Sequence, residues 1–551
     1  MNFNKKLAVA VSGAVLLMAG QFALADSTTD IVDALVMKGV LTEEEGKLIN
    51  KGHTSKAKVA PVVKEKDGAF ILESANEANS IQLTGRMHLD YRYSDLDNTD
   101  ISGRADDRDV SSFTDQFELR RARLGVKGKF AKDFKYEIVG NLPGTATVDI
   151  AYFDWAKYDA FQIRGGKFKQ PFGLEELISS NNITMMERSY LDQTVPAKKI
   201  GLQAMGSLAK GMTYAVSGFQ FNDSQRDMYG DGAISFAGRA TYNFAEAMGD
   251  KENVLHVGLS GLTGQYAISP SSSSQTDTPA AHVTRATISS FRSAGRGLNN
   301  IFRGQIGGVN CTSFSSQTDT PAAHVTRATI SSFRSAGRGL NNIFRGQIGG
   351  VNCTSFSYNC ASEFGGKVEQ KGVGLEGIFA RGPFKLMGEF SASGYQGESV
   401  NSSNSYDTKT FYLETGYFIT GEKYADSYKG GVFSSFKPKN NFDIDNNQWG
   451  AVELAFRIEG YKVDDVQMQG SNQRVQGNLS RGSANNTESG ANTYTAGIRW
   501  ILNPNLVFKA NYAYTKLDNY YTPIDITAAA GTTALLINSE SLFMTRMQYM
   551  F

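Results

Sequence analysis

Residues 86–93 read Arg-Met-His-Leu-Asp-Tyr-Arg-Tyr, with polar or charged side chains at even positions and apolar or aromatic ones at odd positions. Successive side chains of a β-strand point to opposite faces. One face of this segment therefore meets an apolar medium, while the other carries Arg86, His88, Asp90 and Arg92. Since a dry core does not accommodate so many charges, the stretch predicts a strand between an apolar surrounding and water.

The same alternation returns in segments of about ten residues, a length that crosses a bilayer when the strand is tilted. It is clear in 384–390, 494–500 and 506–515. It is sharpest in 543–551, where Phe, Thr, Met, Tyr and Phe share one face. The closing Tyr-Met-Phe looks like the terminal signature of outer-membrane proteins. We therefore expect outer-membrane lipid and the outer-membrane assembly machinery as partners.

The connections between these segments alternate in length. Short turns are predicted at 131–133, 209–211, 381–383 and 503–505, and long polar stretches at 95–115, 222–232 and 470–492. Tight turns on one side and long loops on the other are typical of outer-membrane barrels.

Lipid offers no hydrogen-bond partner to an open sheet edge, so such a sheet must close. Residues 67–551, less the 84 residues of a duplication described below, leave 401. At roughly 25 residues per strand with its connection, this length predicts about 16 strands. The expected fold is all-β: a transmembrane antiparallel β-barrel over 67–551, with a short helical N-terminal extension.

The first 66 residues differ from the rest. Residues 1–25 read as a cleaved signal peptide, with Lys5 and Lys6 followed by an apolar run and a small-residue site. Residues 26–66 are expected to be a periplasmic extension: a helical turn over 31–36, a second helix opened by a capping box at residues 42–45, and a polar linker from 52 to 66. A flexible spacer and a trimerising helical pair both remain open.

The composition excludes several classes of function. Without residues 1–25, 54 basic side chains face 55 acidic ones, so nothing favours nucleic acid. No stretch of 18 apolar residues follows the signal, which excludes helical membrane spans. The five histidines lack nucleophile-elbow or metal-ligand spacing. We therefore expect no enzymatic activity, no catalytic residues, no metal and no cofactor.

Residues 273–314 and 315–356 are identical. No strand alternation runs through them, so we interpret them as a tandem-duplicated loop, whose added length costs little free energy. The two copies carry eight arginines against two aspartates, a net charge of +6. These arginines either line a loop folded into the pore or lie on an external loop. Cys353 and Cys360 suggest a small loop disulfide, with Cys311 left over.

The stretch from Leu83 to about Gln203 resembles the phosphate- and polyphosphate-selective porins of Gram-negative outer membranes. The matching pieces are Gly85-Arg86, Leu119-Arg120-Arg121-Ala122, Tyr152-Phe153-Asp154, Gly166-Lys167-Phe168, Phe172-Gly173-Leu174-Glu175, Ser179-Ser180 and Glu187-Arg188, with weaker similarity at Gly421-Glu422-Lys423.

The resemblance implies a homotrimer of 16-stranded barrels with inward-folded loops and an arginine ladder leading anions to a central site. The residues that it assigns to the anion pathway are Arg86, Arg120, Arg121, Asp154, Glu176, Ser179, Ser180, Arg285, Arg292, Arg296, Lys64 and Lys66. Guanidinium groups suit phosphate because they are always charged and present a fork of donors. Arg120 and Arg121 are adjacent, so both can face the lumen only with a bulge or at a rim.

One position departs from the family pattern. Phosphate-selective members carry a lysine where this chain has Glu176. An anion at the constriction opposes phosphate, so Glu176→Lys is expected to increase phosphate block. Two outcomes stay open: Lys167, Lys169, Lys198 and Lys199 compensate for the anion, or the pore has abandoned phosphate. The predicted function is passive diffusion of small anions through an outer-membrane porin; a general anion preference is expected, with phosphate-type oxyanions open as substrates and without high phosphate specificity. A non-selective or cation-preferring porin and an occluded structural or adhesion barrel stay open as alternatives.

Overall fold

The structure is a computed structural model that describes residues 27–49, 61–66, 69–100, 116–144, 146–220, 234–267, 286–291, 302–306, 324–325, 328–334, 341–348, 352–353, 367–399, 402–468, 474–476, 489–521 and 535–551. The chain forms two compact units. The first comprises residues 1–82 and 128–132, and the second comprises 83–127 and 133–551. No helix of the described residues is long and apolar enough to cross a membrane.

The first unit contains the predicted helical pair. Helix α2 (Ser27–Met37) is followed by Gly39 at φ +70°, the left-handed conformation that ends many helices. Residues 43–49 form the second helix. Thr42 donates its backbone N–H to Glu45 Oε2 at 2.9 Å, while Glu45 donates its own N–H to Thr42 Oγ1 at 3.2 Å, which confirms the capping box.

Part of the predicted linker is a strand. Strand β1 (Val62–Lys66) pairs antiparallel with β2 (Ala69–Glu73), and β2 pairs in turn with residues 80–82 at the start of β3 (Ser80–Asp100). The interpretation of 52–66 as a linker is therefore wrong for its last five residues. A segment of five residues with three charges gives no clear strand signal by itself.

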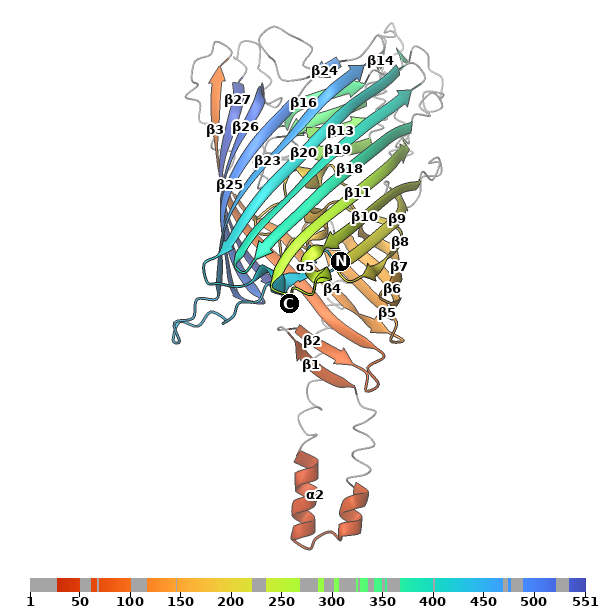
Figure 1. Ribbon diagram of the computed structural model, residues 1–551, viewed down its shortest axis with the longest axis vertical. Helices are drawn as coiled ribbons and strands as arrows, with labels where there is room; N and C mark the ends of the chain where they lie inside the picture. The colour runs from red at the N-terminus through yellow and green to blue at the C-terminus, as the bar shows by residue number, and fades with distance from the viewer. Residues whose placement is uncertain are drawn as a thin grey trace, which may run out of the picture. The chain divides into compact units, whose positions relative to one another are not determined.

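The second unit is a closed antiparallel barrel of 16 strands (Figure 1). Its strands, after β3, are β4 (Gln116–Phe130), β5 (Phe134–Asn141), β6 (Thr147–Tyr158), β7 (Phe161–Lys169), β8 (Lys198–Ala209), β9 (Met212–Gln220), β10 (Ile234–Asn243), β11 (Asn253–Ala267), β18 (Lys367–Arg381), β19 (Phe384–Ser399), β20 (Ser402–Phe418), β23 (Ala451–Met468), β25 (Ser489–Asn503), β26 (Leu506–Tyr521) and β27 (Leu535–Met550).

The barrel closes where β27 pairs with β3, in a register that sets Met550 opposite Arg86. Gly85 and Phe551 extend this ladder with two backbone hydrogen bonds of 3.0 and 3.2 Å. A Cβ on Gly85 would lie 2.4 Å from the Phe551 ring, so only glycine leaves room for the terminal aromatic side chain. The Gly-Arg motif and the terminal aromatic residue are therefore parts of one closure.

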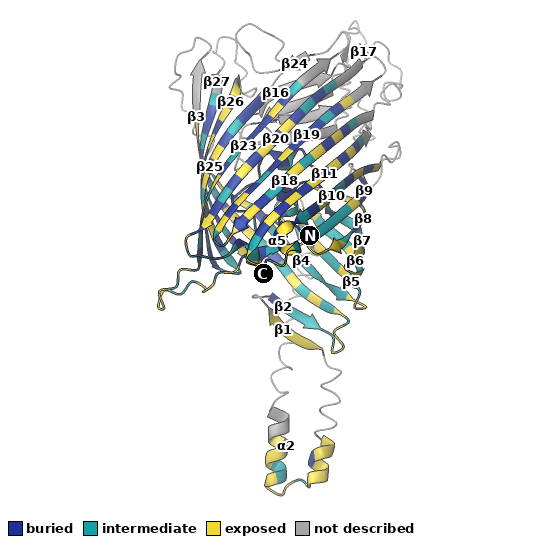
Figure 2. Ribbon diagram, viewed as in Figure 1, coloured by how far each residue is buried: buried dark blue, intermediate teal, exposed yellow. Residues whose placement is uncertain are grey.

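The alternation of apolar and polar residues in the sequence corresponds to an alternation of exposed and buried side chains in the barrel. Met87, Leu89 and Tyr93 are exposed on the outer face, whereas His88 and Asp90 are fully buried toward the interior. Figure 2 shows the same alternation of buried and exposed positions along the other strands. Apolar residues face outward and charged residues inward, as a barrel in lipid requires.

All four predicted tight turns are observed, but some segments predicted as loops contain strands. Strand β3 continues to Asp100, into the predicted loop 95–115, and β24 (Arg474–Gln476) lies within 470–492. The strand-free interpretation of the duplication is also wrong. It contains β12 (Ala286–Phe291), β13 (Phe302–Ile306), β14 (His324–Val325), β15 (Ala328–Arg334), β16 (Asn341–Ile348) and β17 (Asn352–Cys353). The two copies repeat one hairpin, β12–β13 and β15–β16, because identical sequences have the same pairing preference.

Two connections fold into the barrel. The first, residues 170–197 between β7 and β8, contains helix α4 (Leu174–Leu177) and the 3₁₀ helix η2 (Tyr190–Gln193). The second, residues 419–450 between β20 and β23, contains η5 (Tyr424–Ser427), β21 (Tyr428–Lys429) and β22 (Val432–Phe433). We call them the inner loop and the turn-side segment. A shorter connection between β10 and β11 holds α5 (Phe244–Ala247). The largest buried apolar cluster combines residues of both segments with residues of the wall.

Candidate functional site

The inner loop binds the inward faces of β19 to β27, which together with β18 we call the docked wall. Glu389 accepts the backbone N–H groups of Leu174 and Glu175 at 2.6 Å each. Arg457 donates to Glu175 at 3.1 Å and to the Glu187 carbonyl at 3.1 Å. Other wall groups that bind the loop are Glu459, Arg499, Lys509, Asn511 and Arg546. The charges of this wall serve to hold the loop.

A cluster of arginines surrounds Glu187 at the end of this interface. Its carboxylate accepts hydrogen bonds from Arg120 at 2.8 and 3.2 Å, from Arg546 at 2.8 Å and from Arg92 at 3.2 Å. Arg121 approaches only to 3.7 Å. Four guanidinium groups from β3, β4 and β27 thus share one buried carboxylate.

Strand β4 carries the bulge that adjacent inward arginines require. Its exposed residues change from odd positions (Phe117, Leu119) to an even one (Leu124). Such a change needs one extra residue in the strand. Arg120 and Arg121 both contact Glu187, so both face the interior.

Arg86 contacts the paired serines of the inner loop. Arg86 Nη1 donates to Ser180 Oγ at 3.0 Å and to Ser179 Oγ at 3.4 Å. Beside them, His88 Nε2 lies 3.1 Å from Asn181 Oδ1 and His88 Nδ1 lies 3.4 Å from Arg121 Nη1. Because guanidinium only donates, Nδ1 is the acceptor and His88 is the neutral Nε2–H tautomer. Arginine and hydroxyl donors are therefore neighbours at this point of the barrel interior.

Glu176 does not point into open water. Its side chain is 3% exposed and lies 2.9 Å from Arg188 and 3.9 Å from Lys169. Burial raises the pKa of this carboxyl, but Arg188 and then Lys169 lower it further, to about 2. The Glu176 carboxylate is therefore paired with two cations, one of them the Lys169 named above as a compensating residue, and its effect on permeating anions stays a prediction.

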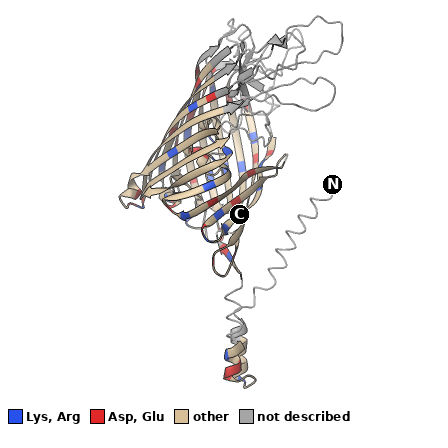
Figure 3. Ribbon diagram, turned by 90° about the vertical axis from the view of Figure 1, so that its right-hand side faces the viewer, with Lys and Arg blue, Asp and Glu red and all other residues tan. Residues whose placement is uncertain are grey.

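The inward faces of β4 to β8, the open wall, retain water-accessible charges. Asp154 lies opposite Arg164 and receives two hydrogen bonds from it at 2.7 and 2.8 Å. The Arg164 guanidinium, 21% exposed, also stacks on the Tyr152 ring at 3.9 Å. Arg123, 15% exposed, lies 2.8 Å from Asp149. Figure 3 shows the charged residues distributed along the barrel strands.

The turn-side segment brings an aromatic cluster into the barrel. Tyr424, Phe433 and Phe436 are buried and pack together, with ring centroids 5.6 to 5.9 Å apart. Lys385 of β19 lies over the first two rings, and Arg499 of β25 lies 4.5 Å from the centroid of the third. The docked wall is thus covered by aromatic rings at its turn side and by the inner loop above them.

The remaining predicted residues belong to the first unit or lie outside the described residues. Lys64 belongs to the first unit, where it binds Glu73 at 2.5 Å. The side chains of Lys66 and Cys353 lie outside the described residues, as do Arg285, Arg292, Arg296 and Cys360 altogether. Their assigned roles and the disulfide stay predictions.

Sequence reasoning did not assign Arg123, Arg164 or the turn-side segment to the site. Alternation could have placed Arg123 and Arg164 on the inner face, since Leu124 and Ile163 beside them are apolar. The segment 419–450 is unusually long for the turn side, which is a readable signal. Its entry into the barrel depends on contacts with distant strands.

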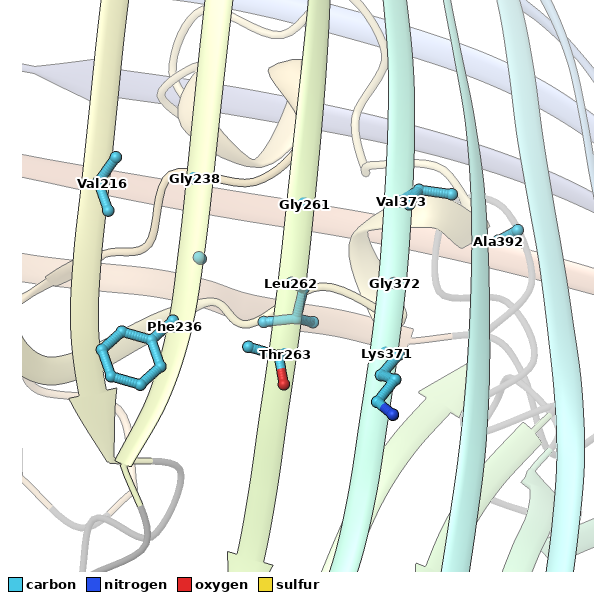
Figure 4. Close-up of a pocket in the computed structure, with 11 residues that line it drawn as sticks. Val216, Phe236, Gly238, Gly261, Leu262, Thr263, Lys371, Gly372, Val373 and Ala392 are labelled. Atoms are coloured by element: carbon cyan, nitrogen blue, oxygen red, sulfur yellow. The ribbon is translucent and has the colours of Figure 1, made fainter.

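An open depression lies elsewhere, on the outer face. It has a volume of about 490 Å³ and is lined by Val216, Phe236, Gly238, Gly261, Val373 and their neighbours on β9 to β19 (Figure 4). The exposed side chains of this face are apolar apart from Lys371 and Thr263 at one end. This depression is part of the lipid-facing surface and not of the arginine-lined interior.

Comparison with known proteins agrees with this arrangement. The sequence model of the family described as phosphate-selective porin O and P matches residues 81–303 and 351–551. Porin O of Pseudomonas aeruginosa is 26% identical over 503 residues, which cover 89% of this chain and 92% of that protein.

Similar solved structures are also porins or outer-membrane channels. The anion-selective porin from Comamonas acidovorans has 10% identity and a TM-score of 0.42, covering 86% of this chain and 100% of that one. The outer membrane channel DcaP of Acinetobacter baumannii has 11% identity and a TM-score of 0.41, covering 86% and 98%.

Proposed function

The chain belongs to the phosphate-selective porin O and P family, and from this premise we propose that its channel favours small anions, with phosphate-type oxyanions in the preferred class. It is a porin of the Gram-negative outer membrane, a channel rather than an enzyme. The further step concerns selectivity and rests on the inner faces of the barrel.

The accessible arginines of the open wall and of strand β3 carry the proposal. Arg86, Arg120, Arg123 and Arg164 all keep part of their surface accessible, and they come from β3, β4 and β7. Two unit charges 4 Å apart interact by about 1 kcal/mol in bulk water and about 4 at an effective dielectric of 20, so a narrow arginine-lined passage favours anions strongly.

Conduction also requires that no single site traps the ion. Each accessible arginine already has an acidic or hydroxyl partner: the serine pair for Arg86, Glu187 for Arg120, Asp149 for Arg123 and Asp154 for Arg164. An oxyanion passing along them exchanges one set of charge-assisted hydrogen bonds for another of similar strength. The partner of each arginine thus lowers its affinity for the passing oxyanion.

The assembly that we propose is a homotrimer in outer-membrane lipid, delivered by a cleaved signal peptide over residues 1–25 and inserted by the assembly machinery. The helical extension contributes to trimer formation in this proposal. Electrophoresis of unheated, cross-linked protein measures the assembly directly, and a monomer alone under those conditions would contradict it.

Reversal potential in a KCl gradient tests the selectivity. Purified protein in a planar bilayer is expected to give an anion-selective potential, and phosphate added to one side is expected to reduce the chloride current. A cation-selective potential, or no conductance, would contradict the proposal. Glu176→Lys is a poor test of the site, because the new ammonium would face Arg188 and Lys169. Glu176→Gln removes the charge without that repulsion.

A further inference from the structure

Arg121 is the one member of the arginine cluster around Glu187 that makes no hydrogen bond to a carboxylate among the described residues. Its residue is 7% exposed, and its Nε atom is buried without a hydrogen-bond partner. It donates one long hydrogen bond, to His88, and its nearest carboxylate oxygen is 3.7 Å away on Glu187. A buried guanidinium with unsatisfied donors is costly unless an acceptor completes it.

Arg546 and Arg92 in the same cluster have a carboxylate of their own. Arg546 binds Asp90 at 2.7 and 2.8 Å, and Arg92 binds Asp90 at 2.7 Å. The single carboxylate that Arg120 and Arg121 both approach is that of Glu187. The bulge in β4 therefore presents two guanidinium groups to one acidic side chain, which bonds fully with only the first.

We propose that Glu187 is a tethered anion that occupies an oxyanion site formed by Arg120 and Arg121 and competes with permeating oxyanions for it. This inference rests on the proposed anion-selective function and adds a residue that sets affinity within it. A phosphate-type ion carries more acceptor oxygens than a carboxylate. Such an ion can accept hydrogen bonds from the unsatisfied donors of Arg121 while Glu187 keeps its bonds to Arg92 and Arg546.

The return of Glu187 then helps to expel the ion. The backbone at Glu187 is held independently of its side chain, by Arg457 at the Glu187 carbonyl and by Asn511 at the Met186 N–H. A side-chain rotation alone therefore suffices, and the loop keeps its place. In this arrangement the acidic residue shortens the residence of the oxyanion.

The variant Glu187→Gln tests the proposal in the full-length channel, with inorganic phosphate as the probe. It keeps the size and an acceptor oxygen but removes the competing charge. The phosphate concentration that halves the chloride current is expected to fall by about tenfold, the factor that corresponds to roughly 1.4 kcal/mol. Glu414→Gln is the matched control, because Glu414 is also an inward-facing glutamate but pairs with Lys385 at 2.7 Å on the docked wall. It is expected to shift the half-blocking concentration by less than about twofold.

A double variant excludes a merely structural role. Arg121→Gln in the Glu187→Gln background is expected to abolish the gain in phosphate block. Equal shifts in Glu187→Gln and Glu414→Gln would overturn the proposal, since they would report only net lumen charge. A higher conductance of Glu187→Gln without stronger phosphate block would also overturn it, since Glu187 would then only clamp the loop. A cation-selective wild-type channel would instead remove the proposed function itself.

Discussion

The docked wall and the open wall are made from the same residue types but use them differently. On the docked wall, Arg457 is 1% exposed and lies between Glu175 and Glu459. On the open wall, Arg164 is 21% exposed with one carboxylate partner. Burial under the inner loop turns charges into structural ion pairs, whereas the part of the open wall around Arg123 and Arg164 keeps charges that water and ions can reach. Charge inside a porin is therefore not equivalent to a conducting surface.

Stability separates the two walls most strongly. Arg546→Met leaves Asp90 and Glu187 buried without their strongest cation and is expected to destabilise the barrel by about 3–5 kcal/mol. Arg123→Gln on the open wall is expected to cost less than about 1 kcal/mol, because its partner Asp149 also binds Lys198. Urea unfolding followed by tryptophan fluorescence measures both. Equal losses would show that the walls do not differ in this way.

A second test of the difference between the walls concerns the turn-side segment, which covers part of the docked wall. Phe433→Ala is expected to cost about 3 kcal/mol of packing, since the ring is buried against Tyr424 and Phe436. Single-channel conductance should rise at the same time, because a covering element of the docked wall is loosened. Exposed Phe153 on the outer face gives a matched control. Unchanged conductance in Phe433→Ala would mean that the segment does not limit the passage.

Ion selectivity is expected to respond to the open wall. Replacing Arg123 and Arg164 by Gln should lower the anion-to-cation permeability ratio by up to about fivefold per charge, equivalent to about 1 kcal/mol each. Lys509→Gln on the docked wall, where the ammonium binds the Ile183 carbonyl, should leave the ratio within about twofold. Reversal potentials of the three variants measure this, and an equal response to Lys509→Gln would contradict the division.

The smallest effect is expected from pH at Glu176. Its folded pKa of about 2 lies below the ordinary value of 4.5. The stability that its charge contributes is therefore present above pH 4.5 and lost only as pH falls toward 2. The difference in chloride reversal potential between wild type and Glu176→Gln should thus be the same at pH 7.5 and pH 5. A difference that shrinks at pH 5 would show that the carboxyl titrates higher.

Much of the barrel could be predicted because its signals are local. Alternation, tight turns and the capping box at Thr42 each depend on a few consecutive residues, and the structure reproduces them. The strands of the duplication were missed because their sequence lacks the outward apolar set that marks a lipid-facing strand.

The site was harder to predict because its contacts join distant parts of the chain. Arg86 and the serines followed from the family resemblance, but the burial of Glu176 depends on Arg188 folding back onto the loop. The sharing of Glu187 with Arg546 spans 359 residues. Whether Arg121 faces inward depends on a bulge in β4, and the alternation of apolar and polar residues does not locate that bulge.

The difference between the walls can be measured directly by cysteine accessibility. In a background with Cys311, Cys353 and Cys360 replaced by Ser, Arg123→Cys represents the open wall and Thr495→Cys, buried on β25, the docked wall. A negatively charged thiol reagent added to the bilayer chamber should reduce the current through the first channel and leave the second unchanged. Equal reaction at residues 123 and 495 would contradict the account, because both walls would then face the water-filled passage.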